Sequence, residues 1–289
     1  MQDEQEKQVD SLFYLKKILE RAKSPLSFKV GTTILVLLLT LALFGPFFYF
    51  NEGEEPHVTF KNLAPTKEHL FGTDELGRDL FVRCCMGLRV SLLVGVAASV
   101  IDLFIGLFYG VVAGCSSSLQ EEWLMRIIDI LQSIPYLLIV LLFVAVFGPG
   151  LKTMIIALAL TGWINMARVV RAGVLKIKNE EFILAAKGFG VSQLRLFTHY
   201  LFPSLRGTIL VVLMATVPSA LFTEAFLSFL GLGIQSPAAS LGTLANDGLL
   251  ALRYYPWRIF FPSLFICLVI FSLNLIGDGL REIFDERAP

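Results

Sequence analysis

The chain has 289 residues, of which 55% are hydrophobic and only 17% are charged, and its formal net charge is +0. Soluble domains carry about 25% charged residues, so this composition indicates an integral membrane protein. The balanced charge and the absence of a basic patch with interleaved aromatic residues give no indication of nucleic-acid binding.

The first part of the chain contains a polar segment followed by an apolar one. In residues 1–24, apolar residues recur at helical spacing with lysines opposite, which predicts an amphipathic helix at the membrane surface. Residues 25–50 contain the apolar run Val30–Phe50, which is long enough to cross the bilayer and begins too late for a signal peptide. Residues 51–89 are polar, with prolines and a charged, glycine-containing turn, and we predict a loop.

The segment 90–280 contains the remaining apolar stretches of helix length. They are Ser91–Ala113, Ile127–Phe147, Met154–Val170, Thr208–Leu230 and Ile259–Ile276. Pro135 and Pro218 lie inside two of them, where a kink is tolerated if neighbouring groups satisfy the freed carbonyls. The sequence therefore predicts an all-α polytopic membrane protein with about six transmembrane helices.

The basic residues indicate how these helices are oriented. Most of the 24 lysines and arginines lie in or next to residues 1–24, in the stretch 168–206, and in the tail 281–289. The positive-inside rule places these segments, and with them both termini, in the cytoplasm. The loop 51–89 is then extracytoplasmic, although it contains several arginines, because long loops cross the membrane largely regardless of charge.

The segment 179–203 is the longest polar interruption between the two apolar halves. Its pattern predicts two short helices joined by a sharp bend. Glu181 lies in the first turn, where the helix dipole favours negative charge, and Gly190 supplies the left-handed conformation of a helix stop. Ser192 is a candidate cap for the second helix, which we expect Pro203 to end.

Ala185 and Ala186 leave one face of the first predicted helix nearly flat beside the glycine bend. A flat face of this kind suits docking into the groove of a partner protein. An ordinary amphipathic hairpin lying on the membrane surface is the alternative.

The hairpin resembles the cytoplasmic EAA coupling loop of ABC importer permeases, whose pattern is Glu-Ala-Ala, three residues, Gly, nine residues, then Ile-x-Leu-Pro. The matching residues are Ala185, Ala186, Gly190 and Pro203, and the departures are Leu184, Tyr200 and Phe202. The resemblance implies that Glu181, Ala185, Ala186, Gly190 and Pro203 form the docking element for an ATPase subunit.

Ionisable residues inside predicted spans are candidate functional residues, because charge within the bilayer is costly. Asp129 lies about one turn into its span, near Arg126, and Glu224 lies deeper in another span. These two are the candidates for lining a translocation path. Asp102 lies in the middle of an otherwise apolar stretch, where a structural bond to a neighbouring helix and a transport role are equally open.

The sequence lacks the usual signs of catalysis. It has no Gly-Lys pair and hence no phosphate-binding loop, and its three histidines, His57, His69 and His199, are too scattered for a metal site. We therefore expect no catalytic residue and no bound metal. The energy for uphill transport must come from a separate subunit or from an ion gradient.

From His69 onward the chain resembles, segment by segment, the second permease subunit of peptide- and nickel-type ABC importers. The matching segments are His69–Asp79, Arg89–Leu92, Met125–Asp129, Gly148–Gly150, Leu160–Trp163, Glu224–Gly233 and Leu273–Arg281. The resemblance implies a type I importer permease core and a location in the bacterial cytoplasmic (inner) membrane.

The resemblance also implies partners and cargo. A second permease, two cytoplasmic ABC ATPase subunits that bind ATP and Mg, an extracytoplasmic solute-binding protein and membrane lipid would surround this non-catalytic chain, which itself would bind no cofactor. The implied activity is import of oligopeptides or dipeptides by alternating access. Nickel or another small solute is an alternative cargo. A stand-alone secondary carrier is a further alternative, but the sequence shows neither the ion site nor the inverted repeat of such carriers.

Overall fold

The structure is a computed structural model that describes residues 25–49, 58–235 and 238–284. The amphipathic helix predicted for residues 1–24 lies outside the described residues. Within the described ranges the chain is helical and contains no strand, only an isolated bridge between Thr73 and Asp79. The predicted all-α class is confirmed.

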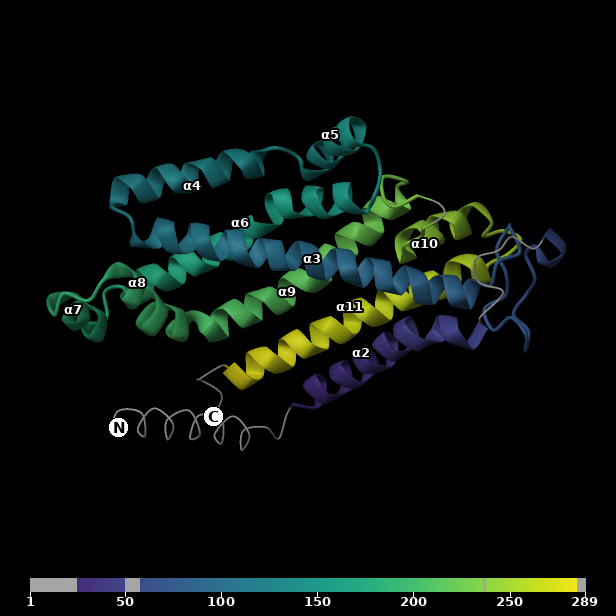
Figure 1. Ribbon diagram of the computed structural model, residues 1–289, viewed down its shortest axis with the longest axis horizontal. Coiled ribbons are helices and arrows are strands. Elements are labelled where there is room, and N and C mark those ends of the chain that lie inside the picture. The colour runs from purple at the N-terminus through teal and green to yellow at the C-terminus, as the bar shows by residue number, and fades with distance from the viewer. Residues whose placement is uncertain (1–24, 50–57, 236–237, 285–289) are drawn as a thin grey trace.

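Ten α-helices make up the described part of the chain (Figure 1). They are α2 (Leu26–Phe44), α3 (Leu80–Cys115), α4 (Ser118–Ser133), α5 (Tyr136–Phe147), α6 (Leu151–Ile177), α7 (Glu181–Gly188), α8 (Gln193–Leu196), α9 (Phe202–Phe229), α10 (Leu241–Leu250) and α11 (Trp257–Phe284). Between α2 and α3 the structure describes two short 3-10 segments. The first, Gly45–Tyr49, directly follows α2, and the second is Val58–Phe60. Five helical segments are long and apolar enough to cross a membrane, and α4 with α5 gives a sixth if the pair counts as one span.

The expected continuous span Ile127–Phe147 is broken in the structure. Helix α4 ends at Ser133, α5 begins at Tyr136, and the two meet at 74°. Pro135 causes the break, because a proline disfavours helical geometry in the residue before it, and Ile134 is accordingly extended with φ −79° and ψ 124°. The sequence predicted a kink here, whereas the structure has two separate helices.

Helix α3 begins inside the segment 51–89 that the sequence predicted as a loop, so the expected boundary at residue 89 is too late. Asp79 starts the helix, since its side chain accepts a hydrogen bond from the Val82 N–H at 3.1 Å. Arg83 is buried against Asp74, and Arg89 donates to the backbone carbonyls of α2. These arginines have partners within the fold, so their charge does not mark a solvated loop.

Helices α3 and α6 pack along most of their length, and a row of glycines on α3 makes this approach possible (Figure 1). Gly106, Gly110 and Gly114 are spaced four residues apart and therefore lie on one helix face. A Cβ atom on Gly110 would lie 2.6 Å from the carbonyl oxygen of Ala167. This small-residue seam is a usual way for membrane helices to pack closely.

We predict that Gly110→Ala destabilises the protein by about 1–3 kcal/mol, the usual cost of overpacking, because the added methyl group meets backbone that cannot rotate away. Thermal unfolding of the detergent-purified chain would measure the change. Gly150→Ala is the matched control, since a Cβ there meets nothing within 4 Å. Equal unfolding temperatures for the two variants would contradict the close α3–α6 contact.

The two ends of the helix bundle carry different structures (Figure 1). The α7–α8 hairpin lies at one end, and the start of α2 and the end of α11 point toward that same end. The loop before α3 and the short helix α10 lie at the opposite end. Helix α10 was not predicted, because ten residues containing an asparagine and an aspartate are too short and too polar to register as a span.

Candidate functional site

The bend of the hairpin 179–203 has the geometry that its glycines predict. Helix α7 runs from Glu181 to Gly188, and Gly190 has φ +74°. The Val191 N–H donates to the carbonyl of Ala186 at 3.2 Å, which is the long-range bond of a Schellman helix stop. The predicted glycine bend is confirmed.

Ser192 caps the second helix as predicted. The Arg195 N–H donates to the Ser192 hydroxyl oxygen at 3.4 Å, and the Leu196 N–H donates to the Ser192 carbonyl at 2.8 Å. Helix α8 then continues into a π-helical turn, Phe197–Leu201, and on into α9.

The expectation that Pro203 ends the second helix is wrong. Pro203 lies in the first turn of α9, and the chain is helical on both sides of it. In the preceding π turn the Phe202 N–H bonds to the carbonyl of Phe197, five residues earlier. A wider turn accommodates a proline, which lacks an N–H and would crowd the carbonyl four residues before it. Pro203 therefore marks the entry to a membrane helix.

The two alanines of the hairpin do not share a face. Ala186 is 6% exposed and belongs to a buried cluster with Ile183, Leu196 and Leu205, whereas Ala185 is exposed. Adjacent helical residues point about 100° apart, so one of the pair can be buried while the other faces out. The buried cluster also contains residues of α6 and α9, and it fixes the hairpin to the ends of both helices.

The outward side of α7 and the residue that follows the helix form a largely apolar surface, which we name the coupling face. It consists of Glu181, Phe182, Leu184, Ala185 and Phe189, all of them exposed. The Phe189 side chain at the bend is 88% exposed, and Leu184, which replaces the glutamate of the EAA pattern, is 53% exposed. Gathered apolar side chains at a polar end of a membrane protein mark a contact surface for another protein.

Asp129 lies on α4 and joins it to α6. Its carboxylate accepts a hydrogen bond from Arg168 at 2.7 Å, and a second ion pair links Glu121 of α4 with Arg171 of α6. These charges line a cavity of about 470 Å³ between the two helices. The ion-pair partner of Asp129 is therefore Arg168 of α6 and not the nearby Arg126.

We predict that Asp129→Asn changes the unfolding free energy by less than about 1 kcal/mol, because the Asp129 side chain is 66% exposed and surface ion pairs contribute little. Thermal unfolding in detergent at low and high salt would measure it. Glu122→Gln, which removes the exposed pair with Arg126, is the control. A much larger loss for Asp129→Asn than for the control would contradict the assignment of the pair to the surface.

Glu224 lies in the last part of α9 and is fully buried. One carboxylate oxygen accepts a hydrogen bond from the Ser228 hydroxyl at 2.7 Å, and the other has no partner within the described residues. The small cavity beside it is lined mostly by apolar residues, among them Leu221, Leu241 and Val269, together with Ser91 of α3. The hydrogen-bond partner of this carboxylate is therefore one turn away on its own helix.

A polar cavity of about 290 Å³ lies between α3, α5, α6 and α9, and Glu224 is not part of it. Its polar lining includes Asp102, Tyr136, Thr161, Thr216, Ser219 and Thr223. Of these, only Asp102 was singled out from the sequence. The sequence also contains a sign of the other lining residues, because Thr216, Ser219 and Thr223 recur at helical spacing and form a polar stripe on α9.

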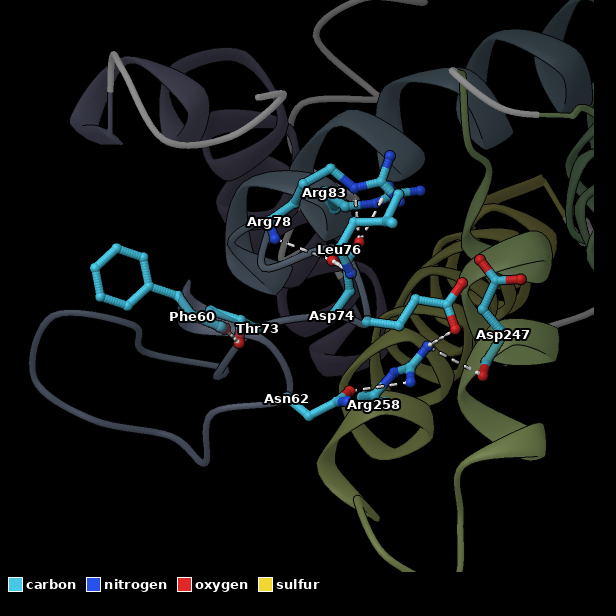
Figure 2. Close-up of polar contacts among 10 residues, drawn as sticks. Phe60, Asn62, Thr73, Asp74, Leu76, Arg78, Arg83, Asp247 and Arg258 are labelled. Carbon is cyan, nitrogen blue, oxygen red and sulfur yellow. Dashed lines mark hydrogen bonds and ion pairs between the residues drawn. The ribbon is translucent and has the colours of Figure 1, made fainter. Parts of the chain in front are cut away.

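The opposite end of the molecule is held by a buried ionic network (Figure 2). Figure 2 shows Asp74 facing Arg78 and Arg83, with ion-pair distances of 2.8 and 3.2 Å. Arg258, at the start of α11, bonds the Asn62 side chain and the backbone carbonyl of Asp247. The loop before α3 is thereby fastened to α3, α10 and α11.

Comparisons with known proteins agree with this architecture. The family model described as binding-protein-dependent transport system inner membrane component matches residues 106–288. The oligopeptide transport system permease protein OppC of Bacillus subtilis (strain 168) is 47% identical over 277 residues, which cover 96% of this chain and 91% of that protein. The dipeptide transport system permease protein DppC of the same organism is 47% identical over 278 residues, covering 96% and 87%.

Among solved structures, an inward-facing form of the MetNI methionine ABC transporter matches with a TM-score of 0.56 and 18% identity, covering 71% of this chain and 96% of the matched chain. At that identity the match supports the fold alone. The family match and the two relatives carry the assignment further. The chain belongs to the binding-protein-dependent transport system inner membrane component family, and it is a multi-pass inner-membrane permease subunit of an ABC importer.

Proposed function

We propose that this permease moves oligopeptides or dipeptides into the cytoplasm by alternating access. Two relatives that are each 47% identical over almost the whole chain are named as oligopeptide and dipeptide transport permeases. Polar side chains line a cavity between the membrane helices, and such a surface is compatible with a hydrophilic cargo. The chain itself performs no chemistry and binds no cofactor in this proposal.

The observation that carries the proposal is the two-sided structure of α7. Its outward side, part of the coupling face, is free, while its inner half is buried against α6 and α9. A partner that moves the coupling face therefore also moves two membrane helices. Closure of an ATPase dimer on ATP would in this way switch the permease between two packed states.

In the proposed assembly, two cytoplasmic ABC ATPase subunits bind ATP and Mg, and one of them docks on this hairpin. Glu181, Ala185 and Gly190 lie at that contact. Ala186 anchors the hairpin from within, and Pro203 sets the start of α9. A second, similar permease completes the membrane pathway.

The proposed orientation places the hairpin and both chain termini in the cytoplasm, with membrane lipid around residues 25–50 and the core 90–280. The loop end, residues 58–79, then faces the extracytoplasmic solute-binding protein. Asp129 would lie at the cytoplasmic mouth of the path, since its cavity lies next to the hairpin end of α6. Glu224 would lie behind the path, within the helix packing.

Purification of the tagged chain from its native membrane in mild detergent, followed by mass spectrometry, tests the proposal. We expect a second permease and two ATPase subunits to co-purify, and the co-encoded binding protein to bind peptides in calorimetry. A chain that purifies alone and transports solute without ATPases would instead be a secondary carrier. A binding protein that takes nickel and no peptide would replace the proposed cargo.

A further inference from the structure

The polar cavity between α3, α5, α6 and α9 contains a carboxylate that the fold leaves unsatisfied. Asp102 is 2% exposed, and its Oδ1 atom has no hydrogen-bond partner within the described residues. The hydroxyl of Tyr136, across the same cavity, also has no partner there. Buried polar atoms are normally paired, and two unpaired ones on one cavity point to a ligand that pairs with them.

The backbone of α6 at Gly162 packs against the Asp102 carboxylate. A Cβ atom at that position would overlap the carboxylate oxygen Oδ2. Any other residue at Gly162 would displace Asp102 from the cavity. The position of the carboxylate is therefore defined by close packing between two helices.

Two threonines of the lining offer acceptors. The Thr216 hydroxyl donates to the Val212 carbonyl at 2.9 Å, and the Thr223 hydroxyl donates to the Ser219 carbonyl at 2.7 Å. A hydroxyl whose hydrogen is used in this way can only accept a further bond. No lysine or arginine is among the described residues that line the cavity. The cavity thus suits a positively charged group that carries several N–H donors.

The cavity opens toward an exposed polar part of the membrane helices. Asn165 of α6 and Ser219 of α9 both line it and are both exposed. Polar side chains on membrane helices face a water-filled path or a protein partner, because lipid does not solvate them. The mouth of the cavity therefore lies where a cargo in transit could enter it.

We infer that this cavity is a transit site for the ammonium group of the cargo, such as the amino terminus of a peptide, with Asp102 as its counter-ion. An ammonium group carries three donors, and the acceptors that line the cavity include the Asp102 carboxylate and the hydroxyl oxygens of the two threonines. The inference rests on the proposed function and adds to it a site for one chemical group of the substrate. A metal ion fits less well, since the described residues contain no group of three potential metal ligands from His, Cys, Asp and Glu.

Thiol labelling tests the charge preference of the cavity without any peptide. Asn165→Cys is placed in a chain whose exposed cysteines, Cys115 and Cys267, are replaced by serine, and the assembled importer is kept in native membranes. Aminoethyl methanethiosulfonate, which is cationic, is expected to react roughly ten times faster than the anionic sulfonatoethyl reagent, after correction for their rates with a free thiol. In an Asp102→Asn background this preference should disappear. An unchanged preference would overturn the inference.

Uptake tests the role of the site in transport. The full importer in proteoliposomes is given its binding protein loaded with a tripeptide or with the N-acetylated tripeptide, and each rate is divided by the wild-type rate so that the preference of the binding protein cancels. Asp102→Asn should slow the free peptide roughly tenfold more than the acetylated one. Thr216→Val should show a smaller effect in the same direction.

Asp278→Asn is the matched control, because it makes the same chemical change in α11, outside the cavity, and should affect both peptides equally. Equal slowing of both peptides by Asp102→Asn would assign that residue a structural role only and overturn the inference. A wild-type importer that takes up neither peptide would contradict the proposed function, while the labelling result would still decide the charge preference of the cavity.

Discussion

Phe189→Asp is expected to reduce substrate uptake at least tenfold while the permease still inserts and folds. Phe189 is 88% exposed at the tip of the hairpin bend, so its ring receives little burial from its own chain. Full burial of a phenylalanine side chain in a partner contributes about 1.5–3 kcal/mol, and interface aromatic residues often dominate binding. A carboxylate there would lose this contribution and would carry an unpaired charge into the contact.

The measurement is ATP-driven uptake by the reconstituted importer together with its ATP hydrolysis. We expect uptake to fall at least tenfold, consistent with the loss of a dominant contact residue, and hydrolysis to lose its dependence on the loaded binding protein. Phe189→Leu, which retains an apolar side chain, should keep most of the uptake. Normal uptake by Phe189→Asp would rule out the coupling face as the docking surface.

Substitutions of the two alanines separate docking from folding. Ala185→Glu places a charge on the exposed coupling face and should reduce coupling, whereas Ala186→Glu places a carboxylate in the cluster that contains Ile183 and Leu205. The second change should lower the folding stability of the hairpin as well, because an unpaired buried charge is costly. Loss of uptake in Ala186→Glu alone is therefore ambiguous, and Ala185→Glu is the variant that tests docking.

The sequence was sufficient to predict features that depend on one residue and its immediate neighbours in the chain. Gly190 and Ser192 specify the bend and the cap through their own backbone and side-chain chemistry, so both were predictable. The orientation of Ala185 and Ala186 was not, since identical side chains give no sign of which one is buried. The role of Pro203 was also hidden, because a proline is equally compatible with the end of one helix and the first turn of the next.

Other features require contacts between distant segments. The arginines at the start of α3 indicated a loop in the sequence, yet Arg83 pairs with Asp74 and Arg89 with the end of α2. The polar cavity brings together four helices, and each contributes only one to three polar residues to it. Such a cavity emerges only when the helices are packed, so the sequence identified Asp102 as unusual without indicating its surroundings.

Asp74→Ala is expected to destabilise the end of the protein that carries the loop before α3 by about 3–5 kcal/mol, the usual cost of removing one partner from a buried ion pair. One Asp74 oxygen accepts the backbone N–H groups of Leu76 and Arg78 at 2.8 and 2.9 Å, and the other binds the side chains of Arg78 and Arg83 (Figure 2). The Arg83 side chain is 8% exposed, and its Nε atom already lacks a partner within the described residues. Without Asp74 the buried Arg83 charge would lose its ion-pair partner.

Thermal unfolding and limited trypsin digestion of the detergent-purified chain would measure this effect, with cleavage at Arg78 reporting release of the loop. Asp74→Asn should be less damaging, because its amide oxygen can still accept the two backbone N–H groups. Glu75→Ala is the control: its side chain is 65% exposed, and Arg258 keeps its bonds to Asn62 and the Asp247 carbonyl. That change should cost less than about 1 kcal/mol. If Asp74→Ala were no more damaging than the control, the buried network would not be what holds the loop to α3.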